Sequence, residues 1–138
     1  MTYEEFVNQP LILRRKIKHK IEDVALKESA CMQNTSQLKE RVQSSVDNST
    51  ERSYVRYIDA KNQLDDMFSD LEIIQDEVRD FLYGNLSPED ADILEWKYID
   101  GKRPRDIAYE VGMNNDAMRQ KIKRADAKAR TKYARKEI

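Results

Sequence analysis

The sequence predicts an all-α protein, in which a long N-terminal helical hairpin or coiled-coil arm precedes a C-terminal unit of three helices. Charged residues make up 37% of the chain and aromatic residues only 8%, a composition typical of long amphipathic helices with charged outer faces. The three glycines and three prolines fall in an order that brackets helices, because proline favours the first turn of a helix and glycine the residue just past its end.

The clearest periodic segment lies in the middle of the chain. Its apolar residues are spaced alternately by three and four, which is the heptad pattern of a helix that packs against another helix. They are Tyr57, Ala60, Leu64, Met67, Leu71, Ile74, Val78 and Phe81. Asn48 and Glu51 have the spacing of a capping box, so we expect this helix to span about Ser49 to Tyr83 and to end at Gly84.

A second apolar line lies upstream and can serve as the partner of the first. It consists of Leu13, Ile17, Ile21, Val24 and Cys31. A hairpin buries the two lines against each other within one chain, whereas a homodimer through the N-terminal helices buries them between chains, and both arrangements fit the pattern. For residues 34–49, helix, loop and linker all remain open, because Asn, Thr and Ser interrupt the apolar period there.

Gly84 sets the expected domain boundary, with a helical arm over 1–84 and a helix-turn-helix domain over 85–138. Ser87 and Pro88 predict the N-cap and first turn of a helix. A second, short helix begins near Pro104, with Ile107, Ala108 and Val111 facing inward, and ends at Gly112. Asn114 is the expected cap of a third helix, whose inner face is given by residues spaced four, three and four apart. These are Met118, Ile122, Ala125 and Ala129.

Charge is distributed unevenly along the chain, although the formal net charge is only −1. From Asp59 to Asp92 there are eleven acids and two bases, whereas from Gly101 to Ile138 there are twelve bases and five acids. A basic end beside an acidic middle is typical of a protein that meets nucleic acid phosphate with one region only.

The third helix therefore carries the candidate site for double-stranded DNA. Its outward residues near the start are expected to read bases, since Arg and Lys recognise guanine and Asn and Gln recognise adenine. They are Asn115, Asp116, Arg119, Gln120 and Lys123. Cations beside them are expected to hold phosphates, and these are Lys121, Arg124, Lys128, Arg130 and Lys132. Arg103 and Arg105, at the start of the second short helix, complete the candidate DNA-binding set.

Four stretches of the C-terminal region together resemble region four of bacterial sigma factors. They are Leu94 to Gly101, Asp106 to Ala108, Val111 to Asn114, and Met118 to Ala125. The segment Glu40 to Ser45 and the heptad helix are also similar to small sigma-like proteins of phages and mobile elements in Gram-positive bacteria. The resemblance implies a sequence-specific transcription regulator that acts at promoters, with RNA polymerase as a partner.

Other classes of protein have less support in the sequence. With one His, one Cys and no Gly-rich phosphate loop, we expect no enzyme, no metal site and no cofactor. A lone cysteine, the lack of a signal-peptide pattern and the lack of a long apolar run predict a cytoplasmic protein that does not enter a membrane. The alternatives to a regulator are a phage DNA-packaging recognition subunit of the small-terminase type and a helical adaptor that binds only protein.

Overall fold

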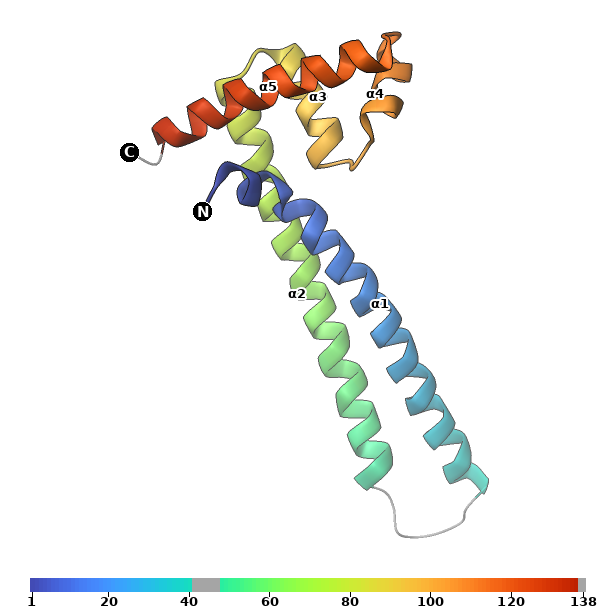
Figure 1. The fold of residues 1–138 in the computed structure, drawn as a ribbon. Helices are drawn as coiled ribbons and strands as arrows, with labels where there is room; N and C mark the ends of the chain where they lie inside the picture. Colours follow the sequence, from blue (N-terminus) through green and yellow to red (C-terminus); the bar gives the residue numbers. More distant parts are fainter. Residues whose placement is uncertain (41–47, 137–138) are drawn as a thin grey trace. The chain divides into compact units, whose positions relative to one another are not determined.

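The computed structural model describes the backbone of residues 1–40 and 48–136 and the side chains of residues 1–33 and 50–136. This part of the chain forms five helices and no strand, so the predicted all-α fold is confirmed (Figure 1). The helices are α1 (Tyr3–Glu40), α2 (Asn48–Asn85), α3 (Pro88–Tyr98), α4 (Pro104–Val111) and α5 (Asn115–Lys136).

The chain divides into two compact units, and the division does not fall at Gly84. One unit, here called the core unit, combines Met1–Ile12 with Leu71–Ile138, and the other, the helix pair, is Leu13–Asp70. The reason is the packing of apolar side chains. Val7 of α1 and Val78 and Leu82 of α2 are fully buried in the same cluster as residues of α3, α4 and α5. The first turns of α1 and the last turns of α2 therefore belong with the C-terminal helices.

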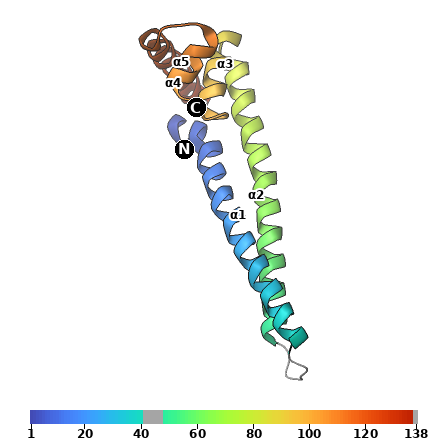
Figure 2. The same ribbon diagram turned by 90° about the vertical axis from the view of Figure 1, so that its right-hand side faces the viewer.

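Within the helix pair, α1 and α2 lie side by side and run in opposite directions (Figure 1, Figure 2). Ile17 and Ala60 are buried, and the Lys20 ammonium donates a hydrogen bond to the side-chain oxygen of Gln63. The predicted place of Ile21 in the contact line is wrong, because this side chain is 47% exposed. Lys20 takes its place, since the partly or fully buried positions of α1 follow a spacing of three and four in which 20 follows 17.

The end of α2 also differs from the prediction, because Gly84 lies inside the helix. The helix continues to Asn85, and the Leu86 amide still donates to the Leu82 carbonyl over 3.0 Å. Packing of Phe81 and Leu82 holds this last turn, and an interior glycine costs a helix only about 1 kcal/mol. At the other end α2 begins at Asn48, whose side chain lies outside the described part of the chain. Of the segment left open in the sequence, 34–40 belongs to α1 and 48–49 to α2, whereas 41–47 lies outside the described residues.

The three C-terminal helices begin and end close to the predicted residues. The Ser87 hydroxyl accepts a hydrogen bond from the Asp90 amide over 3.3 Å, and Pro88 and Pro104 occupy first turns. Gly112 ends α4 with a φ of 77°, a left-handed conformation that favours glycine. Val111, predicted to face inward, is instead exposed. It is the last residue of α4, and beyond the turn Met113 packs against the core.

Candidate nucleic-acid interface

α5 packs on both α3 and α4, and its inner face is the one predicted (Figure 1). Met118, Ile122, Ala125 and Ala129 are all buried. The Asn114 side-chain oxygen accepts a hydrogen bond from the Asp116 amide over 2.9 Å, so the predicted N-cap is confirmed. Buried anchors along one side and a cap at the start fix the rotation of α5, and with it the direction of every outward side chain.

The five residues predicted to read bases lie at the exposed start of this helix. Asn115, Asp116, Arg119, Gln120 and Lys123 are all exposed. Arg119 and Lys123 also line a hollow of about 360 Å³, whose other lining residues are Lys97, Pro104, Ile122, Asp126 and Arg130. Pro104 belongs to the first turn of α4, and the exposed Arg103 and Arg105 flank it in sequence. The structure thus brings the start of α4 close to one flank of α5.

The opposite flank of α5 carries cations that have acidic partners. Lys121 forms an ion pair with Glu89, and the Lys128 ammonium lies 3.6 Å from a carboxylate oxygen of Asp90. Both acids belong to the first turn of α3. Arg124 lies between these lysines at helical spacing and is exposed. To bind a phosphate, Lys121 and Lys128 would first have to leave these carboxylates, at a modest cost because surface ion pairs contribute only about 0–1 kcal/mol.

Arg130 also has a structural partner, which the sequence does not indicate. Its guanidinium donates to the carboxylate of Glu4 over 2.7 Å. This pair raises the pKa of Arg130. The pKa of Glu4 is lowered by a backbone hydrogen bond first and by Arg130 second. Arg130, one of the cations predicted to hold phosphates, is therefore already paired with a carboxylate of the N-terminal segment.

Asp126 is the residue of this region that sequence reasoning missed. The residue is only 8% exposed, and its carboxylate accepts hydrogen bonds from the Tyr3 hydroxyl over 2.9 Å and the Tyr98 hydroxyl over 2.8 Å. The Lys97 ammonium lies 3.1 Å away. Burial, followed by the nearby Asp126 carboxylate, raises the pKa of both phenols. A signal was present, because Asp126 follows Ile122 by four residues and so borders the inner face.

An aromatic cluster surrounds this hydrogen-bonded group and joins four separate parts of the chain. Phe6 of α1 stacks on Tyr133 of α5 with ring centroids 5.2 Å apart, and both rings contact Phe81 of α2 at 5.6 Å. Tyr3 lies within 6.5 Å of Phe81, Tyr98 and Tyr133. The first residues of the chain are therefore part of the support on which α5 rests.

Neither a metal centre nor a membrane segment is found in the described residues. They contain no group of three or more His, Cys, Asp or Glu side chains that could hold a metal ion. Of the helices they form, none has a stretch apolar enough, over sufficient length, to cross a bilayer. Comparison with protein-family models, with curated proteins and with solved structures finds no match.

Proposed function

We propose that this protein is a sequence-specific regulator of transcription that binds double-stranded DNA with α4 and α5 as a helix-turn-helix. The observation that carries the proposal is the start of α5. There Arg119, Gln120 and Lys123 are exposed on a helix whose other side is fixed by buried residues. A short helix, a left-handed glycine at Gly112 and a longer helix in this order match the arrangement in which the second helix enters the major groove.

The outward side chains have the chemistry that reading bases requires. Arg119 can donate two hydrogen bonds to guanine, Gln120 can pair with adenine, and Asp116 can accept from cytosine. Arg103 and Arg105 at the start of α4 are suited to phosphates on one side of the groove. On the other side Arg124 is available directly, and Lys121 and Lys128 become available when Glu89 and Asp90 release them.

RNA polymerase is proposed as the protein partner on the resemblance to sigma region four alone. On the same resemblance we propose that the regulator acts at promoters, as a sigma-like protein of a phage or mobile element. Footprinting on the DNA of that element, with and without polymerase, tests this part. Protection at a promoter that polymerase strengthens supports the regulator. Protection at a packaging site, unaffected by polymerase, would replace it with the packaging subunit.

DNA binding itself is tested by selecting sites from random duplexes with the full-length protein and measuring fluorescence anisotropy on the selected site. We expect Arg119→Ala combined with Gln120→Ala to abolish the preference for the selected site over a scrambled one, while residual binding at low salt persists. Lys61→Ala removes an exposed cation of the helix pair and serves as the matched control. If the wild-type protein binds no duplex at low salt, or binds all duplexes alike, the proposal is wrong.

A further inference from the structure

The helix pair exposes more large apolar side chains than it buries. Among its described side chains, Ile17 and Ala60 are the apolar ones that are buried. Six others are at least 46% exposed, namely Ile21, Leu26, Met32, Tyr54, Val55 and Phe68. The residues of the main buried cluster all belong to the core unit. Within the helix pair, α1 and α2 therefore meet along one narrow line, and much apolar surface remains exposed.

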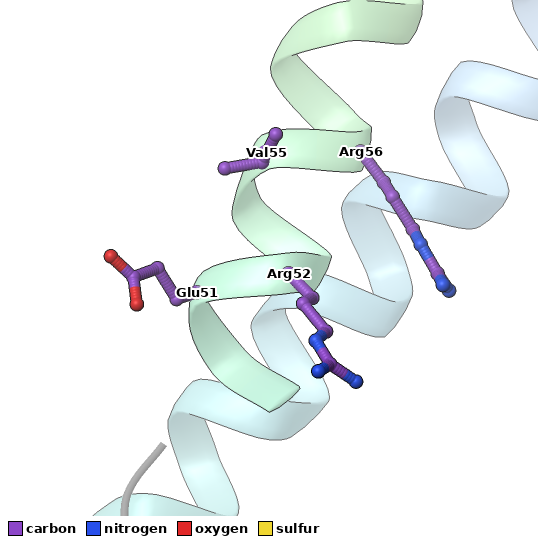
Figure 3. A pocket seen from close by; sticks show the side chains of 4 residues that line it. All are labelled: Glu51, Arg52, Val55 and Arg56. Atoms are coloured by element: carbon purple, nitrogen blue, oxygen red, sulfur yellow. The ribbon is translucent and has the colours of Figure 1, made fainter. Parts of the chain in front are cut away.

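Four of these six exposed apolar residues pair up on one face of their helix. Tyr54 and Phe68 are separated by two heptads and so share a face of α2, and the half-buried Ile58 lies between them. On α1, Ile21 and Met32 are eleven residues apart, which is three turns, so they also share a face. Near the start of α2, Val55 adds a further exposed apolar side chain beside Arg52 and Arg56, where these residues and Glu51 line a hollow of about 480 Å³ (Figure 3).

Charge indicates which partner fits this surface. From Leu13 to Lys20, α1 has five Lys or Arg and no acid, whereas from Asp59 to Asp70, α2 has four Asp and one Lys. The hydrogen bond between Lys20 and Gln63 places these two stretches at the same level of the helix pair. One helix pair thus carries a basic and an acidic segment side by side, and a second helix pair in the same direction can present acid to base and base to acid.

We propose that the helix pair associates with the helix pair of a second copy of this chain to form a parallel four-helix bundle. In such a bundle each α1 lies between its own α2 and that of the partner, and the two α1 helices lie diagonally opposite. The exposed apolar lines close over one another as the inner face of the bundle. Each basic segment meets two acidic ones. An antiparallel bundle would separate these segments, so the charges select the parallel form. The dimer does not depend on the proposed DNA binding, so either proposal can fail without the other.

Light scattering on the full-length protein tests the association. We expect the wild-type protein to have twice the mass of one chain. Ile21→Lys combined with Phe68→Lys should halve it to a single-chain mass at equal concentration, with circular dichroism showing that both proteins remain helical. Val111→Lys places a lysine at an equally exposed apolar position of α4 and should remain dimeric. A single-chain mass for the wild-type protein at its highest soluble concentration overturns the proposal, as does a dimer that survives the double substitution.

Spin labels test the direction of the two chains. Ser69 is exposed, uncharged and at one end of the helix pair, so Ser69→Cys in a Cys31→Ser background gives one label per chain. Parallel helix pairs hold the two labels at the same level, within about 25 Å, because neighbouring helices pack about 8–10 Å apart. Antiparallel pairs put them near opposite ends, on the order of 30 Å or more apart at 1.5 Å per residue. The longer distance in an intact dimer overturns the parallel arrangement.

Discussion

Asp126 shows how one buried carboxylate can organise the core unit. Three donors reach it, from Tyr3, Tyr98 and Lys97. Tyr3→Phe keeps the ring and removes one donor, so we expect the free energy of unfolding to fall by about 1.5–3 kcal/mol, the range for a hydrogen bond to a charged group. Urea denaturation followed by circular dichroism measures the change. Tyr109→Phe is the control, because Tyr109 is 88% exposed and should lose nothing.

The dependence of stability on high pH tests the same hydrogen bonds, those from Tyr3 and Tyr98 to Asp126. The pKa values of Tyr3 and Tyr98 are raised above the ordinary value of 10.0 by burial and by the Asp126 carboxylate. The unfolded chain therefore releases these protons at a lower pH than the folded chain does. The stabilisation that the protonated Tyr3 and Tyr98 contribute is fully present below about pH 10 and is lost as the pH rises further. We expect the free energy of unfolding to fall from pH 9.5 to 11, and Tyr98→Phe to reduce that slope. An unchanged slope in the variant would assign the loss to other groups.

Substitutions at Arg119 and Lys128 test the proposed division between residues that read bases and residues that hold phosphates. Arg119→Ala should lose about 1–3 kcal/mol of binding free energy on the selected DNA site and relax the preference at one base position. Lys128→Ala should weaken binding to all sequences alike and reduce the salt slope by about one, because Lys128 lies further along α5 and is exposed. Competition binding at two salt concentrations distinguishes them. An Arg119→Ala protein that still discriminates fully would mean that another face of α5, or another helix, meets the bases.

At the scale of the helices, the sequence predicts that Gly84 and Gly112 each end a helix, but the two glycines differ in backbone conformation. Gly84 lies inside α2, and a Cβ added there would meet no atom within 4 Å. Gly84→Ala should raise the free energy of unfolding by about 0.5–1 kcal/mol. Gly112 has equal space but a φ of 77°, so Gly112→Ala should lower it. Thermal melting of both variants gives the comparison. A Gly84→Ala protein less stable than wild type would mean that α2 ends at Gly84 after all.

The sequence predicted the helices better than their exact contacts. Caps at Ser87 and Asn114 and the turn at Gly112 are local hydrogen-bond and backbone effects, so four or five neighbouring residues suffice to predict them. Ile21 was wrongly assigned to the contact line because, after Ile17, both position 20 and position 21 fit a helical spacing. Only the contact with α2, where Lys20 reaches Gln63, decides that Lys20 lies inward. Val111 was misplaced because periodicity does not register that α4 ends there.

At the scale of the whole molecule, the outward face of α5 was predictable and its support was not. The exposed set that includes Arg119 and Gln120 follows from periodicity and charge within one helix. The hydrogen bond from Tyr3 to Asp126 joins residues 123 positions apart, and no local pattern indicates it. The predicted boundary at Gly84 assumed that a helix belongs to one unit, whereas α1 and α2 each contribute one end to the core unit and the rest to the helix pair.

This division predicts which pieces of the chain fold. Residues 85–138 alone lack Tyr3, Val7, Val78, Phe81 and Leu82, which are all buried in the core unit. Exposing the apolar faces that these residues cover should leave the fragment with reduced helicity, no cooperative melting and weak, unspecific DNA binding. A chain that joins residues 1–12 to 71–138 through a flexible Gly and Ser linker restores the missing residues and should melt cooperatively. Circular dichroism and anisotropy on both pieces, beside the full-length protein, make the comparison. If the fragment 85–138 melts cooperatively near the melting temperature of the full-length protein, then this fragment folds without the residues that precede it.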